Sequence, residues 1–171
     1  MAYAKLCHHM KEGEQVQDWD EKELLMELKR LLQERKNNKE TEDWIQNNLN
    51  VKQRSSDELV RALMRAVCES VIVAGGGHKV DTRKMFWRMG LLKTYIRDEH
   101  KQLVALNVLQ ELMIHMEHPK NLMRMFFDVL LDEEVIQDEM FFNWESSADT
   151  KTLASVSGFF DWIRKVEQQL S

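Results

Sequence analysis

Hydrophobic residues recur at helical spacing along almost the whole chain. Between residues 21 and 35 one apolar stripe, with charges on the other side, is formed by Leu24, Leu25, Leu28, Leu31 and Leu32. The same spacing predicts further helices over residues 38–49, 55–72, 81–96, 99–118, 119–134, 135–146 and 152–170. No segment alternates between polar and apolar residues as a half-buried strand does. The pattern predicts an all-α protein of about eight or nine helices.

Short connections between these segments make neighbouring helices antiparallel, which predicts an α-solenoid of stacked antiparallel helical hairpins. The chain has no strict internal repeat, so this architecture follows from packing and not from a sequence period. Residues 1–171 are expected to form a single helical-repeat domain, with residues 1–20 as a loosely ordered extension.

Local signals mark several helix ends. Ser55 and Glu58 have the spacing of a capping box at the start of the third helix. That helix is expected to stop at the glycine run 75–77, with Gly75 as its C-terminal cap. The run lacks the Gly-Lys-Ser/Thr ending of a phosphate-binding loop, so it is interpreted as a connection between helices. Asp81 is a suitable N-cap for the next helix, and Pro119 fits the first turn of another.

Composition indicates an intracellular, globular protein. One proline and six glycines in 171 residues leave little material for the turns of a many-stranded sheet. The two cysteines, Cys7 and Cys68, do not suggest a disulfide framework and indicate a reducing compartment. The sequence has no signal-peptide core and no apolar run of the roughly 20 residues that a membrane span needs. We therefore expect a cytoplasmic, monomeric domain without membrane contact.

Two histidine clusters are the candidates for a metal site. Glu111, His115 and His118 lie at i, i+4 and i+7 on one helix face, but a fourth ligand is missing. His118 is also placed to interact with a helix dipole at the end of the helix that precedes Pro119. The cluster Cys7–His9 lacks a second half. Neither pattern predicts a bound metal, and no cofactor is expected.

Catalytic patterns are also weak. The segment 155–158, SVSG, is not a Gly-x-Ser-x-Gly elbow and follows no strand. Paired carboxylates support catalysis only where their surroundings separate their pKa values, which requires a cleft. An enzyme remains an alternative only if a pocket joins distant acids such as Asp128 and Glu111. The sequence predicts no catalytic residue.

The net charge of −5 conceals an uneven distribution along the chain. Residues 79–101 carry seven Lys or Arg and three acids, with aromatic residues among them. Such a segment could bind nucleic acid, because cations contact phosphates and rings stack on bases. The helix over residues 81–96, however, is expected to bury Met85, Phe86, Met89, Leu92 and Ile96, which leaves its cations on a solvated face. Direct binding of RNA is therefore the alternative and not the expectation.

Residues 125–150 are the opposite case, with eight acids, five aromatic residues and no Lys or Arg. Phe141, Phe142 and Trp144 point in nearly all directions around their helix, so at least one ring is expected near the surface. The segment is either a solvated acidic face above buried rings, or a groove in which rings grip Lys/Arg stems and carboxylates bind their heads. A second aromatic and acidic group at residues 159–162 favours the groove.

These two segments resemble the two aromatic/acidic boxes that close the C-terminal two-tryptophan domain of translation initiation factor 4 gamma. The segments RMFFD and FNWESS resemble factor 4 gamma in particular, and residues 57–82 and 103–113 are also similar. By this resemblance the first box, at about residues 126–145, comprises Asp132, Glu133, Glu134, Asp138, Glu139, Phe141, Trp144 and Glu145. The second, at about residues 159–167, comprises Phe159, Phe160, Asp161, Trp162 and Glu167.

The resemblance implies a HEAT-repeat module without catalytic activity, which docks basic segments of partner proteins at the boxes. In factor 4 gamma the partner is the protein kinase that phosphorylates the cap-binding subunit, through a Lys/Arg-rich N-terminal segment. The initiation helicase 4A is a further contact of that scaffold. Related domains in initiation factor 5 and in the epsilon subunit of factor 2B bind lysine-rich segments of initiation factor 2.

The second box departs from the family pattern. The connection over residues 146–158 is short, and the end of the chain carries Arg164 and Lys165 with only Glu167, where relatives are strongly acidic. We therefore expect the second box to be mainly structural, with Trp162 buried, and the first box to provide most of the affinity.

Overall fold

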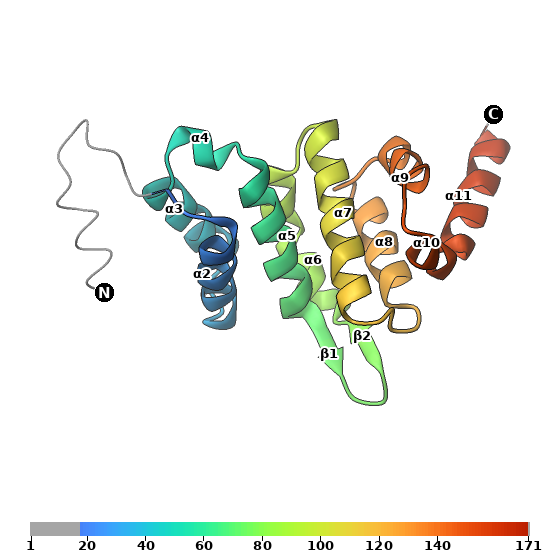
Figure 1. The fold of residues 1–171 in the computed structure, drawn as a ribbon, viewed down its shortest axis with the longest axis horizontal. Helices are drawn as coiled ribbons and strands as arrows, with labels where there is room; N and C mark the ends of the chain where they lie inside the picture. Colours follow the sequence, from blue (N-terminus) through green and yellow to red (C-terminus); the bar gives the residue numbers. More distant parts are fainter. Residues whose placement is uncertain (1–17, 171) are drawn as a thin grey trace.

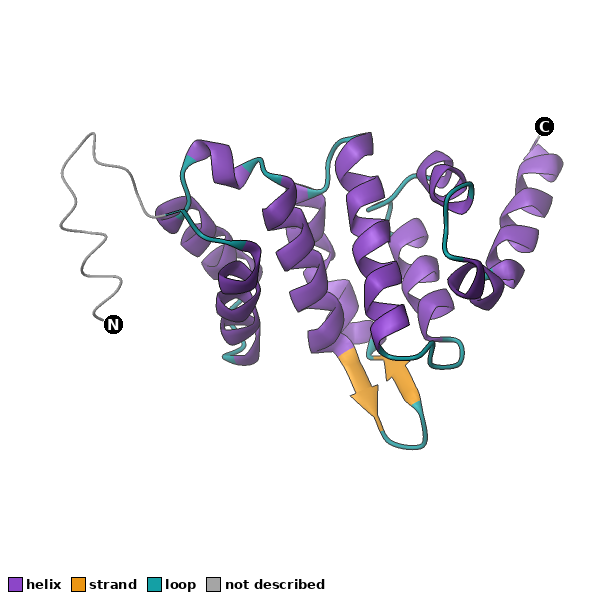
Figure 2. Ribbon diagram, viewed as in Figure 1, coloured by secondary structure: helices purple, strands orange, loops and turns teal. Residues whose placement is uncertain are grey.

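The chain forms a row of antiparallel helices that stack from one end of the molecule to the other (Figures 1 and 2). The computed structural model describes residues 18–170; the predicted extension over residues 1–20 and the cluster Cys7–His9 lie wholly or mostly outside them. The helices are α2 (Glu21–Gln33), α3 (Asn38–Asn48), α4 (Val51–Arg54), α5 (Asp57–Val71), α6 (Thr82–Tyr95), α7 (Glu99–His115), α8 (Leu122–Asp132), α9 (Asp138–Glu145), α10 (Thr150–Ser155) and α11 (Ser157–Leu170). The two strands are β1 (Ile72–Ala74) and β2 (His78–Val80).

Two layers of helices make up the solenoid. In one layer α2 packs on α5, α5 on α7 and α7 on α9; in the other α3 packs on α6, α6 on α8 and α8 on α11. The buried apolar side chains form one continuous core between the layers. The predicted all-α solenoid of stacked hairpins is confirmed. None of the helices among residues 18–170 is both long enough and apolar enough to cross a membrane.

The structure departs from the predicted helices at three places: it adds a short helix, divides another, and begins a third later than predicted. The short helix α4 follows α3 as a separate element, with Asn50 as its N-cap. The predicted helix over residues 152–170 is two helices, because the chain turns at Val156 between α10 and α11. The segment from Pro119 is a turn, and α8 begins only at Leu122. Sequence periodicity does not detect the break at Val156, since the apolar spacing continues across it.

A β-hairpin replaces the predicted glycine cap. The helix α5 ends at Val71, and the chain continues directly into β1, which pairs antiparallel with β2 in the register Ile72 with Val80. The three residues Gly75–Gly77 turn the hairpin with positive φ angles, a conformation that glycine adopts without steric cost. The prediction that Gly75 caps a helix is therefore wrong. The expectation that the chain has no strand is also wrong, since β1 and β2 form a short hairpin.

Side-chain caps begin most helices. Asp81 caps α6 as predicted, and its carboxylate accepts a hydrogen bond from the Lys84 backbone N–H at 3.2 Å. The cap of α5 is Ser56 and not Ser55, since Ser56 Oγ accepts from the Leu59 N–H at 3.2 Å. The Ser55 hydroxyl instead donates to the backbone carbonyls of Val51 and Lys52 in α4. The predicted capping box is therefore wrong: the cap lies one residue later, and the third residue after it is Leu59, whose side chain cannot return a hydrogen bond.

Three helices end in the same backbone motif, with a charged residue in the left-handed conformation. After α2, α7 and α8 these residues are Arg35, Glu117 and Glu134, with φ angles of 60°, 60° and 58°. After α8, the N–H of Glu134 donates to the Leu131 carbonyl and the N–H of Val135 to the Leu130 carbonyl, both at 3.0 Å. This is the Schellman pattern, in which glycine is the usual left-handed residue.

Candidate docking surface

The acids of the first box lie where α8 ends and α9 begins. Asp132 is the last residue of α8, Glu133 and Glu134 follow it, and Asp138 and Glu139 occupy the first turn of α9. Asp132, Glu134 and Glu139 are exposed, and the other two are partly exposed. Among residues 18–170, no Lys, Arg or His side chain forms an ion pair with any of these five carboxylates.

The placement of these acids is favourable in α9 and unfavourable in α8. Asp138 and Glu139 lie beside the N-terminus of α9, where the helix dipole stabilises negative charge. Asp132, Glu133 and Glu134 gather at the C-terminus of α8, where the dipole disfavours negative charge and where the three also repel one another. The α8 end therefore holds a local negative potential that the protein itself leaves uncompensated.

A buried glutamine fixes the turn between the two helices. Gln102 in α7 is 4% exposed, and its Oε1 accepts a hydrogen bond at 3.0 Å from the backbone N–H of Gln137, the residue before α9. Val135 and Ile136 bury their side chains in the core on the same turn. Both contacts hold the backbone of the acidic turn in one position.

The aromatic residues of the two boxes form one cluster around Phe127 of α8. Ring centroids lie 4.8 Å from Phe127 for Phe141, 5.3 Å for Trp144, 5.0 Å for Phe159 and 6.2 Å for Phe160. All five rings are at most 1% exposed. The four box rings therefore cannot touch a partner directly; they hold α9 and α11 against α8 and so position the acids.

Trp162 lies at the surface. Its side chain is 44% exposed, because α11 buries the stripe Phe159, Phe160 and Ile163 and Trp162 falls outside it. The prediction that Trp162 is buried is wrong. Phe142 is the partly exposed ring of α9, as the sequence led us to expect of one of the three, and the Arg164 guanidinium lies 5.3 Å from its centroid.

Glu145 differs from the other acids of the first box. It forms an ion pair with Arg164, which also lies 5.7 Å from the Phe160 ring centroid. The charge of Glu145 is thus compensated within the chain, and the pair ties α9 to α11. Asp161 and Glu167 on α11 are exposed, and no ion pair to either occurs among residues 18–170.

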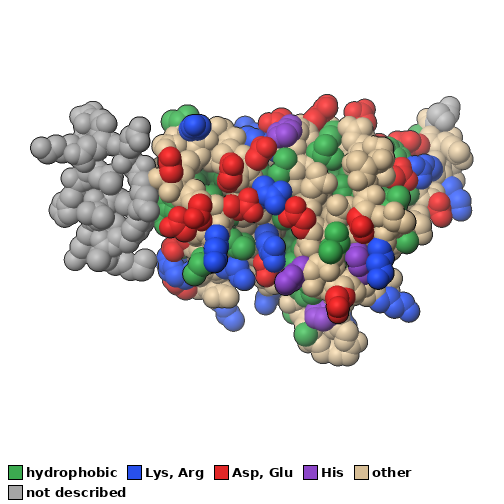
Figure 3. Space-filling model, in the orientation of Figure 1, with side chains coloured by type: hydrophobic (Ala, Val, Ile, Leu, Met, Phe, Trp, Pro, Cys, Tyr) green, Lys and Arg blue, Asp and Glu red, His purple; other side chains and the backbone are tan. Residues whose placement is uncertain are grey.

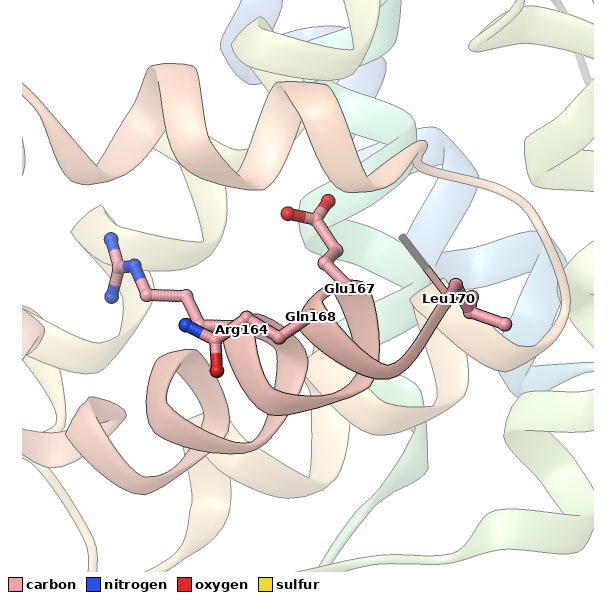
Figure 4. Close-up of a pocket in the computed structure, with 4 residues that line it drawn as sticks. All are labelled: Arg164, Glu167, Gln168 and Leu170. Carbon is pink, nitrogen blue, oxygen red and sulfur yellow. The ribbon is translucent and has the colours of Figure 1, made fainter.

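A shallow hollow of about 550 Å³ lies beside the last turns of α11 (Figure 4). Arg164, Glu167, Gln168 and Leu170 line it from the last turns of the helix. Leu170 is 84% exposed, so the hollow offers apolar as well as charged contacts beside the second box.

The metal and catalytic candidates have structural partners. Glu111 pairs with Arg61 at 2.9 Å, and Asp128 pairs with Arg124 at 2.9 Å, so each acid has its own cation within the fold. His118 follows α7 with a φ angle of 54°, and its Nε2 is 2.8 Å from the Thr152 hydroxyl of α10. Within the described part of the chain, no three His, Cys, Asp or Glu side chains are grouped as metal ligands.

The basic helix α6 differs from its prediction. Met85, Met89, Leu92 and Ile96 are buried as expected, but Phe86 is 59% exposed, and its neighbour Trp87 is 72% exposed. Only one side of α6 packs against other helices, and its opposite side faces solvent. The buried stripe is therefore too narrow to include Phe86. The excess of large apolar residues over one stripe in residues 85–89 was the signal that could have revealed exposed rings.

Comparisons with known proteins agree with the resemblance in the sequence. The family W2, described as eIF4-gamma/eIF5/eIF2-epsilon, matches residues 101–171. The chain is 43% identical over 156 residues to eukaryotic translation initiation factor 4 gamma 1 of Mus musculus, covering 87% of this chain and 10% of that protein. It is 41% identical over 157 residues to eukaryotic translation initiation factor 4 gamma 3 of Homo sapiens, covering 86% of this chain and 10% of that protein. The chain thus spans about a tenth of the length of these relatives.

Proposed function

Since the chain belongs to the W2 domain family of translation initiation factors and resembles factor 4 gamma, we propose that it is a docking module of a translation initiation scaffold. The module binds a Lys/Arg-rich segment of a partner protein at the acidic turn between α8 and α9. The observation that carries this proposal is the group of five uncompensated carboxylates, Asp132, Glu133, Glu134, Asp138 and Glu139, held on a rigid turn.

A cationic segment supplies the positive charge that the acidic turn lacks. It neutralises the repulsion among the three acids at the α8 end and takes the place of the cations that a helix C-terminus favours. Exposed charge pairs contribute about 0 to 1 kcal/mol each, so several must form together. Binding of this kind is fast and weakens steeply as salt is added.

The second box adds apolar contacts to this electrostatic attraction. Trp162 is 44% exposed, and its ring can hold a Lys or Arg head by a cation–π contact and cover its stem. The hollow beside Glu167 and Leu170 can receive an apolar side chain of the same segment. We assign Trp162, Asp161 and Glu167 to partner contact, and Phe141, Trp144, Phe159 and Phe160 to support of the surface.

The partner that fits best is a protein kinase with a Lys/Arg-rich N-terminal segment, the kinase that the factor 4 gamma resemblance implies. The initiation helicase 4A is a second partner of the same scaffold. A lysine-rich segment of initiation factor 2 is the alternative ligand, because related W2 domains recognise that chemistry. A function in initiation places the module in the cytoplasm.

Charge reversal tests the proposal without endangering the fold. The triple substitution Asp132→Lys, Glu133→Lys and Glu134→Lys places cations where the α8 dipole favours them, so the variant should fold at least as well as the wild type. Binding of the purified kinase, with its basic N-terminal segment intact, should fall at least about tenfold, as the loss of three pairs predicts.

A matched control changes the net charge equally elsewhere. Glu58→Lys, Glu99→Lys and Glu117→Lys replace three exposed acids that have no ion pair among residues 18–170. This control should bind the kinase within about twofold of the wild type, since distant exposed charges are screened. Equal binding by both triple variants, with circular dichroism unchanged, would reject the acidic turn as the docking site.

A further inference from the structure

A second surface, separate from both boxes, lies at the edge of the solenoid beside the hairpin. The end of α2, the loop to α3, the end of α5 and the first turns of α6 enclose a groove of about 920 Å³. Figure 3 shows Lys and Arg side chains gathered beneath α2 and α5 on this side. The cations that line the groove are Arg35, Lys36, Arg83, Lys84 and Arg88.

Most of this positive charge has no ion-pair partner in the part of the chain that the structure describes. Arg35, Arg83 and Lys84 are exposed, and none of the three forms an ion pair among residues 18–170. Lys36 is the exception, since its Nζ lies 3.7 Å from a Glu40 carboxylate oxygen. The groove therefore carries a net positive potential in a protein of net charge −5.

The acids that line the groove do not cancel this potential. Glu69 is already paired, with Lys29 at 3.4 Å and with Arg65 at 3.0 Å. Asp81 is the N-cap of α6 and accepts the Lys84 backbone N–H at 3.2 Å. Both carboxylates are committed to the fold, which leaves the groove cations for an external anion.

The walls of the groove are fixed by hydrogen bonds between distant segments. Arg88 Nη1 donates to the Lys36 carbonyl at 2.8 Å and to Asn38 Oδ1 at 3.1 Å. Asn38 Nδ2 donates to the Trp87 carbonyl at 2.7 Å. Arg88 thus holds the α2–α3 loop against α6, and the backbone of Trp87 is held at the same junction. A preformed site of this kind loses little entropy when it binds a ligand.

A largely exposed tryptophan ring lines this groove. Trp87 lines the groove and is 72% exposed, and Phe86 beside it on α6 is 59% exposed. Large exposed rings next to cations are the two elements of single-stranded nucleic acid binding, in which bases stack on the rings and Lys/Arg contact the phosphates. An acidic peptide would use the cations but would not need a flat ring.

We infer that this groove binds single-stranded RNA, with Arg35, Arg83 and Lys84 on the phosphates and Trp87 stacked on a base. The amide side chains of Gln33 and Asn37 line the same groove and can hydrogen-bond base edges. Its volume is sufficient for a few nucleotides. The groove lies toward the α2–α3 end of the solenoid and the acidic turn toward the α8–α9 end, so RNA and a basic protein segment can bind together (Figure 1).

Fluorescence anisotropy with a labelled oligouridine of roughly twelve nucleotides, in about 50 mM salt, tests this inference. Trp87→Ala should weaken binding at least about fivefold, which is the lower limit for the loss of one stacked base. Arg83→Glu with Lys84→Glu should weaken it at least about tenfold and reduce the slope of log K against log salt by roughly 1.4, about 0.7 for each phosphate contact.

Controls separate this site from the docking surface. Lys52→Glu with Lys120→Glu makes the same charge change at exposed lysines outside the groove and should leave RNA binding within about twofold. Trp162→Ala should weaken kinase binding and not RNA binding, and Trp87→Ala should do the reverse. No measurable RNA binding by the wild type, equal loss in the groove and control variants, or preferential binding of a poly-glutamate peptide would each overturn the inference.

Discussion

The aromatic cluster makes a quantitative prediction about Phe127. Its ring is fully buried and contacts four other rings edge to face, at centroid distances of 4.8 to 6.2 Å, from Phe141, Trp144, Phe159 and Phe160. Replacing a buried Phe by Ala costs about 3 to 5 kcal/mol, and ring pairs of this geometry add roughly 0.5 to 1.5 kcal/mol each. Since these contributions are not additive, we expect Phe127→Ala to reduce the free energy of unfolding by about 4 to 5 kcal/mol.

The effect should be concentrated in one part of the molecule. Phe127 lies in α8, and all four of its ring partners lie in α9 and α11, so the C-terminal helices should separate first. In a solenoid each hairpin contacts only its neighbours, so the α2–α5 end should remain folded under mild denaturant. Kinase binding should weaken in parallel, although no acid of the boxes has been changed.

Urea unfolding followed by circular dichroism, with hydrogen exchange to locate the opening, measures both effects. Phe127→Leu keeps most of the volume and should cost only about 1 kcal/mol. Phe86→Ala removes a ring that is 59% exposed and should change stability by less than about 0.5 kcal/mol. A loss for Phe127→Ala no larger than that for Phe86→Ala would refute the central role of this cluster.

Three smaller predictions concern individual hydrogen bonds. Asp57 accepts a 2.8 Å hydrogen bond from His100, and this contact raises the pKa of the imidazole above its ordinary value of 6.5. The pair therefore stabilises the fold below pH 6.5, and the stabilisation is lost as the pH rises through the raised pKa of the folded state. Thermal melts from about pH 5 to pH 9 should show this loss in the wild type and not in His100→Gln. Ser56→Ala should cost about 1 kcal/mol in urea unfolding and Ser55→Ala clearly less, because only Ser56 caps α5; the opposite order would contradict the cap. Gln102→Ala should cost about 2 kcal/mol in the same assay, since it leaves the N–H before α9 without its acceptor, whereas an unchanged midpoint would show that the turn does not depend on this bond.

The sequence predicted the elements whose signals are local and repeated. The leucine stripe of α2 and the buried stripe Met85, Met89 and Leu92 of α6 follow from helical spacing, and the solenoid follows from short connections. The acids of the first box are exposed or partly exposed, as expected of charged residues at a helix junction. These features depend on neighbours a few residues away, which a single sequence displays directly.

Other features depend on contacts between distant segments. Arg164 lies 19 residues from Glu145, and Arg88 lies 52 residues from the Lys36 carbonyl, so neither pairing has a local signal. The exposure of Phe86 and Trp162 is decided by the width of the helix face that a neighbour covers, which periodicity overestimates. The position of the α5 cap differs by one residue because two adjacent serines carry the same local preference.

At the left-handed residues after α2 and α8, fold stability and ligand binding favour different amino acids. Arg35 lines the basic groove and Glu134 belongs to the acidic turn, and both occupy backbone positions in which a non-glycine residue is strained by roughly 1 to 2 kcal/mol. Glycine at either position would relieve this strain and make the domain more heat-resistant, but it would remove a charge from one of the two proposed binding sites. Selecting variants for thermal tolerance alone would therefore drift toward a sturdier protein that no longer recruits its ligands, and a thermostable version should be built by changes at other sites.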